Sequence, residues 1–200
     1  TYTVKSGQTE GEYTIKISAE GQEKLLTFMI DGTAPTIMPD SSVPADNTWV
    51  KTKALSVSGT ATDATSGIEK IEAIVNGTAT VLGTTSPWSG YLTLNEGNNT
   101  VQFKVTDKAG NSNDPTSAPA RTIKLDTGLP TITLTTPANG QALVNRTSTS
   151  YQVTVTVSDT GGSGIAKVEY DTTSGFASTP PLPSATPMGG VATINLTGIN

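Results

Sequence analysis

Hydrophobic and polar residues alternate along most of this chain, and turn residues separate the alternating runs. In the run VQFKVT, for example, Val101, Phe103 and Val105 point to one side and polar residues to the other. A period of two, broken by turns every eight to twelve residues, is typical of antiparallel sheets with one face in water. The pattern therefore predicts an all-β fold built from β-sandwiches.

The clearest alternation lies in the middle of the chain, where seven strands are expected. They span residues 36–39, 52–61, 68–75, 78–83, 90–94, 100–106 and 121–125. Asn76-Gly77 should form a two-residue hairpin turn, because both positions of such a turn favour positive φ. The inward rows should include Leu55 with Val57, and Ile71 with Ala73 and Val75.

The chain also repeats itself. MIDGTAPTI at residues 29–37 returns as KLDTGLPTI at residues 124–132, about 95 residues later, and the triplet SGI at Ser66 recurs at Ser163 with nearly the same spacing. A repeat of this length is the usual size of an immunoglobulin-like sandwich. We therefore predict tandem immunoglobulin-like modules joined by short Asp/Pro linkers. Residues 1–30 would be the last strands of one module, 31–125 a complete module, and 126–200 a module that is incomplete at its C-terminal end.

Acidic side chains recur at the expected module junctions. Strand directions place the loops after the second and sixth strands at the same end of the sandwich as the entering linker. Four oxygen-bearing side chains should therefore converge there: Asp31, Asp63, Asp107 and Asn111. Asp126 and Asp159 repeat the first two at the next junction.

Converging carboxylates without a counter-charge repel one another and resist ionising together. Calcium resolves this, because it binds six to eight oxygens from carboxylates, amides and carbonyls. The hypothesis is that calcium binds at each junction and stiffens the linker. The alternative is that each aspartate caps its own turn through backbone hydrogen bonds, with no metal. The N-terminal segment departs from the pattern, since its turn SAEGQ has Ala19 or Glu20 where Asp107 would be expected.

Several segments resemble the tandem bacterial Ig-like (Big-type) repeats of large secreted and cell-surface proteins. They are LTFMIDGTAPTI, VNGT, PWSGYLTLNEGNNTVQFKVTDKAGN and SGI. The resemblance covers nearly the whole chain and implies an adhesin, a surface-layer protein or an accessory module of a polysaccharide-degrading enzyme. It also implies calcium on Asp31, Asp63, Asp107 and Asp126. The second linker, LDTGLP, lacks the TAP form but keeps the aspartate and the proline.

The composition excludes several kinds of chemistry. The chain has neither histidine nor cysteine, so it has no imidazole base, thiolate nucleophile or disulfide. Its net charge is −5 with acids and bases interspersed, whereas a nucleic-acid-binding surface would need a basic stripe. No apolar run approaches the length of a membrane span. We therefore predict no catalytic residues and no enzyme activity.

Two other kinds of site remain open. Four Asn-X-Ser/Thr triplets are candidates for N-glycosylation, at Asn76, Asn98, Asn145 and Asn195. Trp49 and Trp88 are candidates for stacking on sugars, although a lone tryptophan in a sandwich more often packs in the core.

The sequence as a whole predicts a non-catalytic structural spacer of an extracellular or cell-surface protein. Its partners would be neighbouring modules of the same chain, and identical subunits of a lattice or filament, or surface glycans. Two other functions fit the same features: a carbohydrate-binding accessory module of a secreted polysaccharide-active enzyme, and a decoration domain of a phage or filament.

Overall fold

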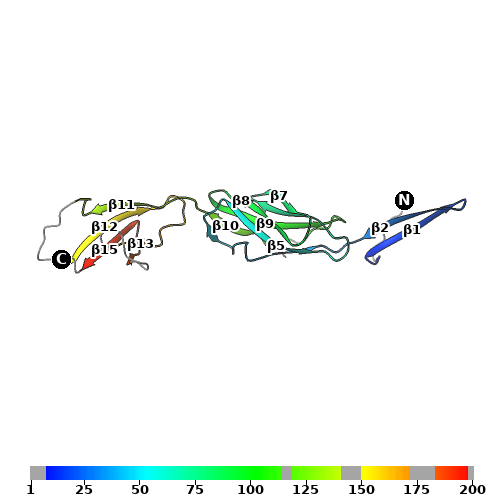
Figure 1. The fold of residues 1–200 in the computed structure, drawn as a ribbon, viewed down its shortest axis with the longest axis horizontal. Coiled ribbons are helices and arrows are strands. Elements are labelled where there is room, and N and C mark those ends of the chain that lie inside the picture. The colour runs from blue at the N-terminus through cyan, green and yellow to red at the C-terminus, as the bar shows by residue number, and fades with distance from the viewer. Residues whose placement is uncertain (1–7, 114–118, 141–149, 172–182, 198–200) are drawn as a thin grey trace. The chain divides into compact units, whose positions relative to one another are not determined.

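A computed structural model describes residues 8–113, 119–140, 150–171 and 183–197 (Figure 1). Every regular element among these residues is a β-strand, so the prediction of an all-β fold is confirmed. None of them belongs to a helix that is long and apolar enough to cross a bilayer. The chain divides into two compact units, residues 1–125 and 126–200. The finer division into three parts, with a boundary at residue 30, stays a prediction.

The first unit begins with a long hairpin of β1 (Gly11–Ala19) and β2 (Gln22–Ile30). The strands pair antiparallel in one unbroken register, in which Tyr13 lies opposite Phe28 and the two rings stack at 5.8 Å. Glu20 and Gly21 form the turn, and both have positive φ, as a two-residue hairpin turn requires.

Two sheets follow and form the central module. The first has the strand order β3 (Thr36–Pro39), β5 (Ala54–Thr62), β8 (Trp88–Thr93). The second has the order β4 (Thr48–Val50), β10 (Arg121–Leu125), β9 (Gly97–Asp107), β6 (Ile68–Val75), β7 (Thr78–Gly83). The seven predicted strands are all present. β4 is an additional short strand that pairs parallel to β10 at the edge of the sheet.

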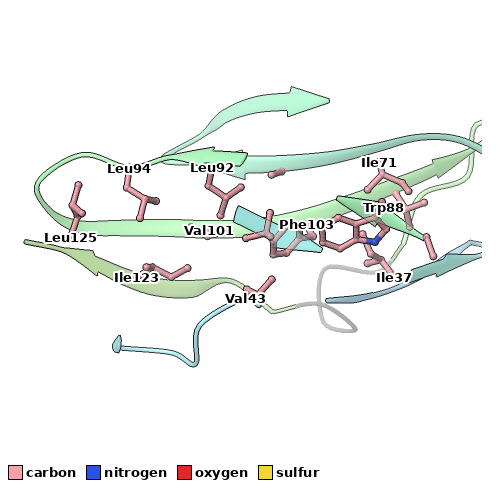
Figure 2. Packing of buried hydrophobic residues seen from close by; sticks show 14 residues of the cluster. Ile37, Val43, Ile71, Trp88, Leu92, Leu94, Val101, Phe103, Ile123 and Leu125 are labelled. Atoms are coloured by element: carbon pink, nitrogen blue, oxygen red, sulfur yellow. The ribbon is translucent and has the colours of Figure 1, made fainter. Parts of the chain in front are cut away.

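The core of the central module lies between these two sheets (Figure 2). All three residues of the predicted row on β9 are buried there, as are Val57, Ile71 and Ala73. The rings of Trp88 and Phe103 pack at 5.2 Å across the core. Gly59 makes room for the indole, because a Cβ at that position would lie 2.5 Å from Trp88 Cζ2. Asn76 and Gly77 both have positive φ, which confirms the predicted turn.

The second unit repeats part of this arrangement. β11 (Thr131–Thr136), β12 (Ser150–Ser158) and β15 (Val191–Thr197) form one sheet in the order of β3, β5 and β8. β13 (Val168–Glu169) and β14 (Ser184–Ala185) pair as β6 and β7 do. Its buried cluster is small: Val155, Val157, Val168, Ala192 and Ile194. The chain is thus made of immunoglobulin-like antiparallel β-sandwich modules.

Candidate metal centre

Three aspartates from separate segments come together at the start of the central module. Asp31 follows β2, Asp63 follows β5 and Asp107 ends β9. One carboxylate oxygen of each lies within 4.8 Å of the others. They meet because β5 and β9 both run toward the end of the sandwich at which the linker enters. Asp107 is fully buried, whereas Asp31 and Asp63 are half-buried.

Asp31 and Asp63 each bind backbone N–H groups of their own turn and of the loop that follows β5. Asp31 accepts hydrogen bonds from the N–H of Thr33 at 3.0 Å and of Ser66 at 3.0 Å. Asp63 Oδ1 accepts from the N–H of Thr65 at 3.2 Å and of Gly67 at 2.6 Å. The Ser66 bond is the important one, because it ties the linker to the body of the module.

Asp107 and Asn111 form the third side of the cluster. Asp107 Oδ1 accepts from the N–H groups of Ala109 and Asn111, both at 2.9 Å. The Asn111 side-chain amide donates to Asp107 Oδ2 at 2.9 Å and to the Asp31 carbonyl at 3.2 Å. Asn111 therefore joins the loop after β9 to the linker as a hydrogen-bond donor. As a metal ligand it stays a prediction.

One oxygen of the cluster has no partner. Asp63 Oδ2 is buried and accepts no hydrogen bond. Among the described residues, no lysine or arginine forms a salt bridge with any of the three aspartates. A buried carboxylate oxygen without a partner is costly, and a cation removes that cost. The donor set is entirely oxygen, which suits a hard cation such as Ca²⁺.

The expected resistance to ionisation does not apply to Asp31. The Ser66 side chain is the largest cause that lowers the pKa of Asp31 below its ordinary value of 3.8, and the backbone N–H groups of Thr33 and Ser66 lower it further. Partial burial acts in the opposite direction but is outweighed. Hydrogen-bond donors therefore keep this carboxylate charged, which prepares it to bind a cation.

The shift gives a pH dependence. Because the folded pKa of Asp31 is depressed, its stabilising contribution is complete above about pH 4 and is lost as the pH falls through the folded pKa. We expect Asp31→Asn to destabilise the chain in chelator at pH 7 and to differ less from wild type at pH 2.5. Urea denaturation at the two pH values measures this. An equal difference at both would contradict the assignment.

Glu10 is a residue of this region that the sequence analysis missed. Its carboxylate accepts hydrogen bonds from the Gly32 N–H at 3.0 Å, from the Thr33 hydroxyl at 2.8 Å and from the Thr65 hydroxyl at 3.4 Å. It therefore connects the start of the hairpin to the linker and to the loop after β5. No repeat of Glu10 exists elsewhere in the chain to draw attention to it.

The second junction reproduces the first only in part. Asp126 accepts from the N–H of Gly128 at 2.9 Å and of Ser163 at 3.0 Å, as Asp31 does from Thr33 and Ser66. Asp159 accepts from the Gly161 and Gly164 N–H groups. Ser163 lowers the pKa of Asp126 chiefly through its side chain. Within the described residues no third acidic side chain joins this pair, so its binding of a metal stays a prediction.

The remaining predicted positions have different surroundings. Asn76 is exposed, but its side-chain amide is already hydrogen-bonded. It donates to Asn99 Oδ1 and accepts from the Thr100 N–H. Asn98 and Asn195 are exposed on β9 and β15, and Asn145 lies outside the described residues. Trp88 is buried in the core, so it is not an exposed platform for stacking a sugar. Trp49 is partly exposed, and the Lys124 ammonium lies over its ring at 5.7 Å from the ring centroid.

Residues 36–126 match the family model described as Glucodextranase, domain B. A solved structure of fibronectin(III)-like modules of Clostridium thermocellum CbhA is 17% identical, with a TM-score of 0.43 over 82% of this chain and 80% of that one. None of the curated proteins matches the chain. The matched residues are those of the central module. The more specific resemblance to Big-type repeats stays a prediction.

Proposed function

We propose that this chain is a non-catalytic structural spacer of a secreted or cell-surface protein, such as an adhesin stalk or a surface-layer or filament subunit. We further propose that a calcium ion fixes the linker between its modules. The observation that carries the proposal is the buried, unpartnered Asp63 Oδ2 beside the carboxylates of Asp31 and Asp107. Each carboxylate belongs to a different segment, so one cation would hold three segments together.

The three aspartates and the ion have distinct tasks in this account. A bound calcium ion would supply positive charge, and the carboxylates of Asp31, Asp63 and Asp107 would supply part of the six to eight oxygen ligands that it takes. Asp63 anchors the site to the module, because both N–H bonds to its Oδ1 come from its own loop. Asp31 brings the linker to the same point. Asp107, at the end of β9, is the third carboxylate of the proposed site.

Other features of the linker limit bending even without a metal. Pro35 restricts the backbone just before β3, since its ring fixes φ. Glu10 binds the linker at Gly32 and Thr33 from the side of the hairpin. A cation at Asp31 would add to an already restrained segment. A spacer needs this property because its reach depends on how little each joint bends.

The test is the stiffness of the joint between the hairpin and the central module. Spin labels on Ser18→Cys and Thr80→Cys report it directly, because the chain has no native cysteine. Pulsed electron–electron double resonance gives the distribution of distances between the two labels. We expect this distribution to narrow when calcium replaces chelator. Asp63→Asn should abolish the narrowing. Asp159→Asn, the matched position in the second unit, should keep it. Equal widths with and without calcium would refute the proposal.

A second candidate function is that of an accessory module of a secreted polysaccharide-active enzyme. The match to glucodextranase domain B supports it. So does a pocket of about 460 Å³ whose lining includes Met38, Asp40 and Trp88. Electrophoresis in gels that contain a glucan tests this function. If the protein were retarded in such gels, and Met38→Ala or Asp40→Ala removed the retardation, this function would be favoured over that of a spacer.

A further inference from the structure

The two sheets of the central module leave an open flank between β7 and β8. Each of these strands is the outer strand of its sheet, and the two lie side by side (Figure 1). A pocket of about 260 Å³ lies at this flank, and it shares no lining residue with the pocket at Met38. Its lining includes Thr78 and Thr80 of β7, Tyr91 and Thr93 of β8, and Asn95 of the loop that follows.

β7 carries polar side chains on the face that a sandwich normally fills with its core. Thr80 lies opposite the buried Ala73, and Thr78 lies opposite Val75, so both threonines are on the core-facing side of their sheet. Both are nevertheless exposed, because the other sheet ends at β8. A hydroxyl that is covered by apolar surface without a hydrogen bond is costly. A ligand that covers this row must therefore offer hydrogen bonds to it.

Tyr91 adds an aromatic surface to the same pocket. It is 67% exposed, whereas the next residue of β8, Leu92, is 1% exposed and faces the core. A tyrosine ring offers a flat apolar face and a polar hydroxyl at its tip, and the C–H face of a pyranose ring can pack on such a surface. None of the described residues that line the pocket carries a charge. This combination suits a neutral ligand that is rich in hydroxyls.

A buried amide holds one end of the pocket in place. Asn99 is fully buried, and its Oδ1 accepts hydrogen bonds from Asn76 Nδ2 at 3.0 Å and from the Asn95 N–H at 2.8 Å. Its own Nδ2 donates to the Asn95 carbonyl at 2.7 Å. Both asparagines that it binds line the pocket. The turn after β6 and the loop after β8 are therefore fixed before a ligand binds, which lowers the entropic cost of binding.

An extended peptide fits this pocket less well than a sugar. Because β8 is the outer strand of its sheet, a peptide strand would have to pair along its free edge. Leu82 of β7 lies against β8 at Gly90, where an added Cβ would meet Leu82 Cδ2 at 2.7 Å. This contact limits the open edge to a few residues. The volume is also close to the lower limit of about 300 Å³ for ligand pockets, which suits a short stretch of sugar units.

We propose that the pocket between β7 and β8 binds a neutral polysaccharide, one of whose pyranose rings stacks on Tyr91. Thr78, Thr80 and Asn95 would exchange hydrogen bonds with the sugar hydroxyls. The proposal rests on the second candidate function, to which it gives a site and a ligand class. It does not depend on the calcium cluster, because β6 begins beside Asp107 and reaches the pocket only at its other end.

Affinity electrophoresis of the full chain in gels that contain dextran, pullulan or laminarin tests the proposal. We expect at least one of these neutral glucans to retard the protein. Tyr91→Ala should weaken binding roughly tenfold or more, because the stacking surface is lost, whereas Tyr91→Phe should stay within about threefold of wild type. Thr80→Val should also weaken binding. Val81→Thr is the matched control, because Val81 is the next residue of β7 and lies on the opposite face.

The outcomes separate this site from the second candidate function as a whole. Retardation that Met38→Ala removes and Tyr91→Ala leaves unchanged would keep that function and overturn this site. No retardation by any of the three glucans would overturn both. Equal effects of Thr80→Val and Val81→Thr would also contradict the site. Because Tyr91 is largely exposed, Tyr91→Ala should leave the melting temperature unchanged, so a loss of retardation reports binding rather than unfolding.

Backbone amide chemical shifts locate the ligand directly. When a hexasaccharide of the retarding glucan is added to the isotope-labelled chain, the N–H signals of Thr80, Tyr91 and Thr93 should shift. The signal of Asp107 should stay in place. Shifts confined to the surroundings of Met38 would overturn the proposal. So would shifts along β8 that an extended peptide of alternating threonine and valine produces and the hexasaccharide does not.

Discussion

Replacing Phe103 with alanine should lower the free energy of unfolding of the central module by about 3–5 kcal/mol. Phe103 lies on β9, is 4% exposed and packs against Trp88 at 5.2 Å. Its removal takes away one member of that ring pair and leaves a cavity between the two sheets. The loss is large compared with the roughly 5–15 kcal/mol by which a whole domain is usually stable.

Urea denaturation followed by tryptophan fluorescence measures this change. Tyr91→Ala is the matched aromatic control, because Tyr91 lies on β8 and is 67% exposed. Its effect should stay within about 0.5 kcal/mol. If the two variants were destabilised equally, Phe103 would not hold the two sheets together as described.

Calcium should produce the second large effect. At a free concentration about 100 times its dissociation constant, a ligand that binds only the folded state stabilises it by about 2.7 kcal/mol. For a domain of this size that corresponds to a rise in melting temperature of roughly 10 °C. Asp63→Asn should remove most of the rise, because it takes away the charge of the carboxylate whose Oδ2 has no partner.

Calorimetric melts with calcium, with magnesium and with chelator check this prediction. Magnesium should give a smaller rise, because it demands near-octahedral geometry and gives up its water reluctantly. Asp159→Asn should behave like wild type in the melt of the central module. A melting temperature that is the same in calcium and in chelator would show that the aspartates only cap their turns.

The fold was predictable because alternation is a direct consequence of strand geometry. The row of Val101, Phe103 and Val105 repeats every second residue, so both the strand and its buried face follow from the sequence. β4 is only three residues long, too short for alternation to show. Its pairing with β10 depends on tertiary packing, which a local pattern does not contain.

The candidate site was predictable in its residues but not in its hydrogen bonds. Strand direction brings Asp31, Asp63 and Asp107 to one end of the sandwich, which requires only a count of strands. The position of Glu10 depends on how the hairpin joins the linker, and Glu10 has no repeat in the sequence. The pKa of Asp31 likewise depends on the orientation of Ser66, which only the structure supplies.

Isothermal titration of the full chain with calcium tests the central claim most directly. The claim is that Asp31, Asp63 and Asp107 together hold one hard cation at the linker. We predict saturable binding at this site that Asp63→Asn abolishes and Asp159→Asn preserves. No binding to the wild type, or unchanged binding to Asp63→Asn, would contradict it.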